Sequence, residues 1–216
     1  MTMVRSQILE KLLTGIKNKK VPNAICFIDK GGRGSLKLAS EIGLAVVGKP
    51  FSALNNSNYI HPDLHYVYPT KIPKEERLFK KGMTAFYIDK WREFLHAHIY
   101  GSVDEWLEFS SPVKKPGTIR VDQISEAISI LNLKPFQSDK KVCILWGLKY
   151  LKEDVANRML KIIEEPPKQT YFFLIAEDEK KIIPTLASRC QMVRLPPLVK
   201  DEIASGLRET EDKRSL

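Results

Sequence analysis

Short apolar runs of strand length, separated by helical patterns, constrain this chain more than any other feature of its sequence. The runs that predict strands lie at 24–28, 64–68, 142–146, 171–176 and 192–195. Three of them are almost entirely apolar, as strands are when both faces of their sheet are covered. Apolar residues recur at helical spacing near 6–18, 36–46, 121–131, 155–163 and 182–186. The alternation predicts an α/β protein, a doubly wound parallel sheet with helices on both faces.

The segment 70–118 does not follow this alternation. Its charged pieces surround one predicted helix, which carries Trp91, Phe94 and Leu95. We expect an irregular insertion at the periphery of a core domain that spans 1–197. From 198 to 216 a charged helix begins a second unit.

Composition excludes several classes of protein. No stretch approaches the ~18 uncharged apolar residues of a membrane helix, and the N-terminus has no apolar signal core. The odd number of cysteines, 3, speaks against a disulfide framework and suits a reducing cytoplasm. A net charge of +9 allows a nucleic acid or an acidic partner, but a solvated basic surface would have the same composition.

A glycine cluster at 29–34 follows the first predicted strand and invites comparison with a phosphate-binding loop of the pattern G-x-x-x-x-G-K-[ST]. Aligned on the following helix, Asp29 stands at the first glycine and Gly34 at the second, with Gly32 between them. Ser35 then replaces the lysine, and Leu36 replaces the hydroxyl residue that binds Mg²⁺. The glycine of the turn is present, but the lysine and the metal-binding hydroxyl are missing. The glycines alone would also suit an ordinary strand-to-helix turn.

The predicted strand at 142–146 shows the same loss. An active ATPase of this type ends the strand with carboxylates that hold Mg²⁺ and orient water. Here Trp146 and Gly147 occupy that place, and no acidic residue follows until Glu153. Both sites argue against ATP hydrolysis by this chain.

Several blocks of residues carry a resemblance to a known family. In chain order they read HPDLH at 61–65, IRVDQI at 119–124, KVCIL at 141–145, ANRMLKIIEEPP at 156–167, TYFFL at 170–174 and PTLASRCQ at 184–191. Together they resemble the bacterial clamp loader family of AAA+ proteins, most closely its delta-prime branch. The resemblance covers most of 20–198 and implies an AAA+ P-loop-NTPase-like core followed by the start of a helical lid.

The resemblance also implies roles for three residues. The arginine of the family's Ser-Arg-Cys block is an arginine finger, which reaches the ATP of a neighbouring subunit, and it corresponds to Arg189. A planar, permanently charged guanidinium suits several phosphate oxygens at once. Ser188 and Cys190 are then expected to position its turn, although an ordinary surface arginine with packing neighbours would show the same pattern.

The resemblance implies a non-catalytic stator subunit of the DNA polymerase III holoenzyme, which helps ATP-driven loading of the sliding clamp onto primed DNA. The expected partners are the gamma/tau ATPase subunits and the delta subunit, and indirectly the clamp and primer–template DNA, with no membrane. ATP and Mg²⁺ are expected only on partner subunits.

The chain departs from the family in several places. Many relatives carry a four-cysteine zinc module, but 47–62 contain no cysteine, so no metal is expected. The histidines His61, His65, His96 and His98 are interpreted as structural or surface residues. The polar sensor position near Glu177 looks degraded, and the chain ends within the first lid helix, without the family's C-terminal collar.

Two other functions remain open on the sequence. One is an active AAA+ motor subunit with an unusual phosphate loop, which measurable ATP binding would favour. The other is a sequence-tolerant DNA-binding module. Its candidate phosphate contacts are Lys17, Lys19, Lys20, Lys114 and Lys115, and its binding should weaken steeply with added salt.

Overall fold

The computed structural model describes residues 3–18, 20–30, 34–49, 59–71, 83–197 and 204. Its centre is one sheet of five strands in the order β2-β3-β4-β1-β5. The strands are β1 (Ala24–Ile28), β2 (Leu64–Val67), β3 (Lys141–Trp146), β4 (Thr170–Ala176) and β5 (Gln191–Arg194). All neighbouring strands run parallel, which confirms the predicted fold class.

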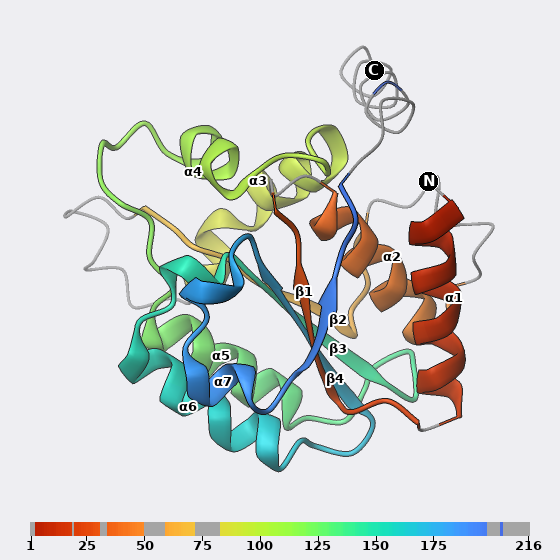
Figure 1. Cartoon of the computed structure of the whole chain (residues 1–216). Coiled ribbons are helices and arrows are strands. Elements are labelled where there is room, and N and C mark those ends of the chain that lie inside the picture. The colour runs from red at the N-terminus through yellow and green to blue at the C-terminus, as the bar shows by residue number, and fades with distance from the viewer. Residues whose placement is uncertain are drawn as a thin grey trace.

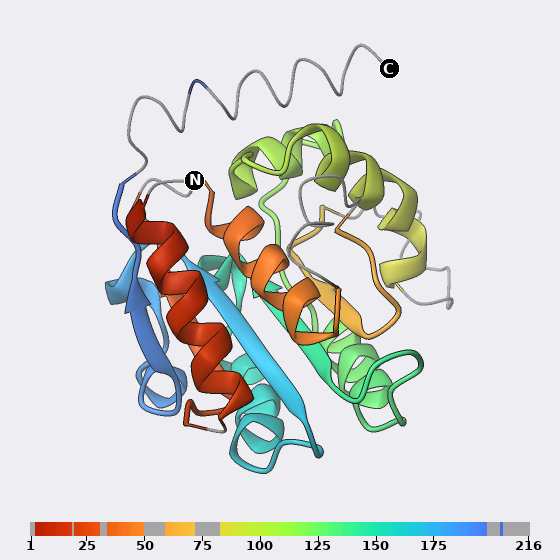
Figure 2. The same ribbon diagram turned by 90° about the vertical axis from the view of Figure 1, so that its right-hand side faces the viewer.

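Helices cover both faces of this sheet (Figures 1 and 2). One group consists of α1 (Met3–Lys17), α2 (Ser35–Val46), α3 (Met83–Ala97) and α4 (Val103–Ser110). The other consists of α5 (Val121–Leu131), α6 (Glu153–Glu164) and α7 (Pro184–Ala187). Two short 3₁₀ turns, η3 (Leu148–Tyr150) and η4 (Glu179–Lys181), follow β3 and β4.

The alternation of side chains along each strand divides the core into two halves. Ile144 and Phe173 belong to the half beneath α1 to α4. Their strand neighbours Cys143 and Phe172 belong to the half beneath α5 to α7. Successive residues of a strand point to opposite faces, so a strand buried on both sides is apolar nearly throughout, as β3 and β4 are after their first residues.

The segment expected to be an irregular, peripheral insertion contains two helices, α3 and α4, whose aromatic side chains join the main core. The ring of Trp91 stacks on Tyr68 with centroids 4.0 Å apart. Trp106 is fully buried and donates a hydrogen bond from Nε1 to the Pro69 carbonyl at 2.8 Å. A capping box between Ser102 and Glu105 begins α4. The described charged residues Asp89, Arg92, Glu93 and Glu108 of these helices are exposed.

Buried ionic groups hold the connection between α5 and β3. Asp63 is 2% exposed, and its carboxylate accepts hydrogen bonds from the backbone N–H groups of Phe136, Gln137 and Ser138 at 2.6 to 2.8 Å. Lys141, 3% exposed, donates to carbonyls at the end of α5, including that of Leu131. Both ends of this connection are therefore fixed through its backbone.

Two further expectations concern membrane helices and the second predicted unit. Within the described residues, no helix is long and apolar enough to cross a membrane. The predicted start of a lid at 198–216 lies outside the described residues, apart from Ala204.

Candidate functional site

The carboxyl ends of the strands meet at one edge of the sheet, where ligands bind in open α/β folds. Asp29 follows β1 and Glu177 follows β4, and these two strands are neighbours. The N–H of Asp29 donates to the Ala176 carbonyl at 3.0 Å. Two carboxylates therefore stand at the position where a nucleotide-binding relative would hold phosphate.

Asp29 takes the place of an anion at the start of α2. Its Oδ2 accepts a hydrogen bond from the Ser35 N–H at 3.1 Å, and its Oδ1 lies 4.0 Å from a guanidinium nitrogen of Arg5. The first N–H groups of a helix bind anions readily. Burial raises the pKa of Asp29 more than Arg5 and the Ser35 hydrogen bond lower it.

The other residues of the glycine loop have structural roles. Gly34 precedes α2 with φ of 98°, a left-handed conformation that favours glycine. Ser35 and Leu36 are each 1% exposed, and Leu36 packs in the core half beneath α1 to α4. Gly32 lies outside the described residues. Gly34 is thus favoured by the backbone conformation of the turn. Ser35 and Leu36, which stand at the lysine and hydroxyl positions of the phosphate-loop pattern, are buried.

The end of β3 is likewise occupied by residues without acidic groups. Trp146 is 2% exposed and packs against the rings of Trp91 and Phe94. Gly147 has φ of 84°, and a Cβ there would stand 3.3 Å from Val103. An acidic side chain at position 147 would be both strained and crowded, so packing with α4 replaces the metal-binding acid of an ATPase.

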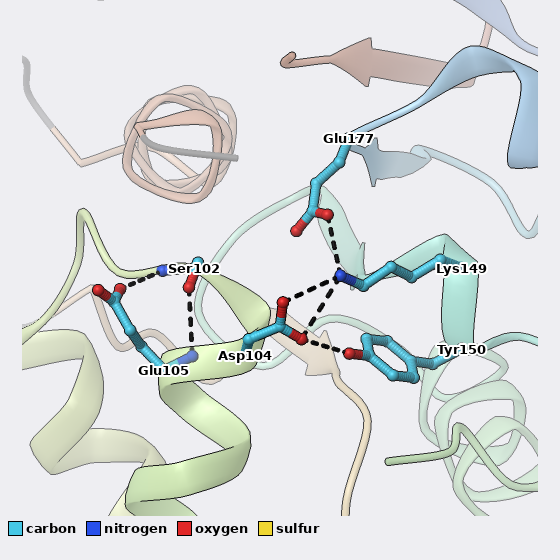
Figure 3. Close-up of polar contacts among 6 residues, drawn as sticks. All are labelled: Ser102, Asp104, Glu105, Lys149, Tyr150 and Glu177. Atoms are coloured by element: carbon cyan, nitrogen blue, oxygen red, sulfur yellow. Dashed lines mark hydrogen bonds and ion pairs between the residues drawn. The ribbon is translucent and has the colours of Figure 1, made fainter. Parts of the chain in front are cut away.

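A polar cluster lies beside this edge (Figure 3). The Lys149 amine is 3.0 Å from an oxygen of Glu177 and 3.3 Å from one of Asp104. The Tyr150 hydroxyl donates to Asp104 at 2.5 Å. Burial lowers the pKa of Lys149, but its hydrogen bond to Glu177 and the nearby carboxylates outweigh burial, so the pKa is raised. The cluster joins α4 to the ends of β3 and β4 through a lysine that stays charged.

Arg189 lies in the turn between α7 and β5, on a different part of the molecule from Asp29. Its Nε donates to Glu164, the last residue of α6, and its Nη1 donates to the Thr185 carbonyl at 2.9 Å. Ser188 Oγ accepts from Nη1 at 3.4 Å and donates to Thr185. The structure therefore brings Ser188 into contact with the arginine.

Cys190 has a different environment. It is half-buried and packs against the core half beneath α5 to α7. Burial raises the pKa of its thiol to about 11, so it stays protonated at neutral pH. Its contacts are those of a packing residue.

Of the histidines predicted to be structural or surface residues, His61 and His98 make contacts within the fold. His61 Nδ1 accepts a hydrogen bond from the Asp63 N–H at 3.1 Å, and burial lowers the pKa of His61 and of His65. The His98 ring stacks on Phe94 with centroids 5.4 Å apart. Among the described residues no group of three or more His, Cys, Asp or Glu could hold a metal ion. The expectation that the chain has no metal remains a prediction.

Sequence reasoning missed Lys149, Asp104 and Glu164. The first two are separated by 45 positions along the chain, and only the packing of α4 against η3 makes them neighbours. Glu164 stood within the EEPP block, but nothing in its spacing indicates a contact with Arg189, 25 residues away.

Comparison with known proteins gives a consistent result. Residues 4–199 match the family described as "DNA polymerase III, delta subunit". The DNA polymerase III subunit delta' of Escherichia coli (strain K12) is 34% identical over 87 residues, which cover 40% of this chain and 26% of that protein. The subunit delta' of Bacillus subtilis (strain 168) is 24% identical over 220 residues, covering 98% of this chain and 53% of that protein. The chain thus spans about half the length of the Bacillus relative.

A solved structure shares the fold. A DNA polymerase III gamma subunit-related protein from Thermotoga maritima aligns with a TM-score of 0.54 and 18% identity. The alignment covers 94% of this chain and 53% of that one. At this identity the likeness concerns the fold alone.

Proposed function

Because this chain belongs to the DNA polymerase III delta family that it matches over residues 4–199, we propose that it is a non-catalytic subunit of a bacterial clamp loader. In this proposal it binds no nucleotide of its own and serves as a stator beside ATP-binding gamma/tau subunits and the delta subunit. The assembly would use their ATP to place a sliding clamp on primed DNA.

The contact between Asp29 and α2 carries the non-catalytic part of the proposal. An ATP phosphate would need the N–H groups at the start of α2, and the Asp29 carboxylate already accepts from one of them. Leu36 cannot ligate Mg²⁺, and Trp146 supplies no carboxylate. A phosphate approaching this edge would meet the Asp29 carboxylate, and Lys149 beside this edge is already paired with Glu177.

Arg189 supports the part of the proposal that concerns partners. Its side chain is 37% exposed, so the guanidinium is accessible from outside the subunit. A finger of this kind spreads its charge over phosphate oxygens in the transition state of phosphoryl transfer. We assign Arg189 this action in trans, on ATP held by a neighbouring subunit.

A nucleotide titration tests the proposal directly. The purified chain would be titrated with a fluorescent ATP analogue and Mg²⁺, with a partner ATPase subunit as the positive control. We expect no saturable binding up to millimolar concentration. Tight binding that excess unlabelled ATP competes away would contradict the proposal and indicate a motor subunit instead.

A further inference from the structure

Two segments far apart in the chain meet at Arg189. Glu164 ends α6 immediately before Glu165 and the two prolines, and its carboxylate accepts from Arg189 Nε. The two side chains are partly exposed, at 43% for Glu164 and 37% for Arg189. An ion pair at such exposure contributes little to the stability of a fold. The ion pair matters more for the orientation of the Arg189 side chain than for the stability of the fold.

The guanidinium is held at two of its three nitrogens. Glu164 binds Nε, while the Thr185 carbonyl and Ser188 Oγ accept from Nη1 at 2.9 and 3.4 Å. In the part of the chain that the structure describes, no residue accepts a hydrogen bond from Nη2. The arginine thus has an ordered stem and an unused donor group.

We propose that Glu164 is a positioning residue, which holds Arg189 in the orientation that presents Nη2 to a phosphate group of the neighbouring subunit. This inference rests on the proposed action of Arg189 in trans. Glu164 itself touches no substrate and acts only through the arginine.

The physical reason is the conformational freedom of arginine. A free arginine side chain populates many rotamers, and ordering it on engagement with ATP opposes the interaction. Contacts made within the subunit before engagement remove that cost, so the charge is already placed where the transition state needs it. Thr185 and Ser188 fix the position of Nη1, and Glu164 fixes the rotation of the planar group about it.

The test uses the clamp loader reconstituted from this subunit and its ATPase and delta partners. DNA-stimulated ATPase would be measured for Glu164→Ala, Glu164→Gln, Arg189→Ala and the double variant Glu164→Ala/Arg189→Ala. We expect Glu164→Ala to lower kcat about fivefold, as for partial loss of side-chain ordering, with the KM for ATP unchanged. Glu164→Gln keeps an acceptor oxygen, so it should restore part of the rate.

Glu165→Ala is the matched control, because Glu165 is the adjacent exposed acid and makes no hydrogen bond to Arg189. Incorporation of each variant would be checked by size-exclusion chromatography of the assembled loader. Thermal unfolding of each free subunit should be unchanged, because the pair is exposed.

The outcomes separate this inference from the proposed function. If Glu164 acts only through Arg189, Glu164→Ala will have no further effect in the Arg189→Ala background. Additive losses, an unchanged rate or a faster rate for Glu164→Ala alone would overturn the positioning role. If Arg189→Ala itself leaves the ATPase of a loader that contains it unchanged, the action in trans is wrong, and the positioning role is overturned with it.

Discussion

The carboxylate of Asp29 accepts a hydrogen bond from the Ser35 N–H at 3.1 Å, at the amino end of α2. Asp29 is 3% exposed, so this anion belongs to the interior of the protein. Arg5 of α1 lies 4.0 Å away and donates a hydrogen bond to the Pro196 carbonyl. These contacts form a structural joint that connects α1, the start of α2 and the segment after β5.

This joint predicts how a nucleotide site could be rebuilt. The triple variant Asp29→Gly/Ser35→Lys/Leu36→Thr should bind ATP and Mg²⁺ in a fluorescence titration, because it restores the open turn, the cation and the hydroxyl ligand. It should not hydrolyse ATP, because Trp146 and Gly147 still provide no carboxylate.

The matched control for the rebuilt site is the double variant Ser35→Lys/Leu36→Thr, which keeps Asp29. We expect it to remain without ATP binding, since the carboxylate still occupies the helix terminus. Equal binding by both variants would mean that Asp29 is not the group that excludes phosphate.

Replacement of Arg189 should affect the assembly and leave the subunit folded. We expect Arg189→Ala to lower the DNA-stimulated ATPase of the reconstituted loader about tenfold or more, which is less than the ~10³–10⁵ of an isolated arginine finger because this is one of several sites. Arg194→Ala is the control, because Arg194 is also exposed and also pairs with a glutamate, Glu179, but lies at the other end of β5. Similar losses for both variants would point to surface charge in general.

The stability of the protein should depend on pH through Asp63. Burial by itself would raise the pKa of this carboxyl, but three backbone N–H donors hold it below its usual range. The folded state therefore binds a proton less readily than the unfolded state. The stabilisation is complete above the ordinary aspartate pKa and is lost as the pH falls through the lower, folded value.

Asp63→Asn tests this dependence. The amide has a single acceptor oxygen, so at least one of the N–H groups of 136–138 loses its partner to an amide NH₂ that cannot accept, and we expect a loss of about 3 kcal/mol in the free energy of unfolding. Urea denaturation from about pH 7 to about pH 3 should show a shallower decline for the variant than for the original protein. Parallel declines would assign the acid sensitivity to other carboxylates.

Lys149→Met should weaken the connection between α4 and the sheet. The lysine side chain is 24% exposed and separates the carboxylates of Asp104 and Glu177, which would face one another without it. We expect a loss of about 1 kcal/mol in urea denaturation at neutral pH. Lys152→Met, at an exposed lysine nearby, should change the stability by less than about 0.5 kcal/mol, and equal effects would show that the cluster adds nothing.

The centre of the sheet was predictable from sequence because β1, β3 and β4 are buried on both faces. The β4 run is apolar at all seven positions except its first. A strand with one face in water would have polar residues at alternate positions, so this run predicts a strand buried on both faces. The helix α5 was predicted because apolar residues recur along one side, with its end expected near Pro135, and the observed helix ends earlier, at Leu131.

The contribution of α3 and α4 was not predictable in the same way. Trp91 and Trp106 are buried by contacts with Tyr68 and with each other, and these contacts join segments remote in sequence. The start of α4 did have a local signal, the serine and glutamate of its capping box, three positions apart. Of the candidate site, sequence indicated which groups were missing and that Asp29 stands in the glycine loop, but not that Lys149 lies between the carboxylates of Asp104 and Glu177.

Asp63 and Lys141 hold the connection between α5 and β3 through its backbone N–H and carbonyl groups, so these contacts do not depend on the side chains that the connection carries. Phe136 is 80% exposed and Leu133 is 67% exposed, while the peptide groups beside them are held from both directions. A cysteine introduced at position 136 would therefore carry a fluorophore on a stiff base, and its rotation would report the tumbling of the whole subunit with little loop motion of its own. The same property makes this tip a suitable place to graft foreign residues without disturbing the sheet.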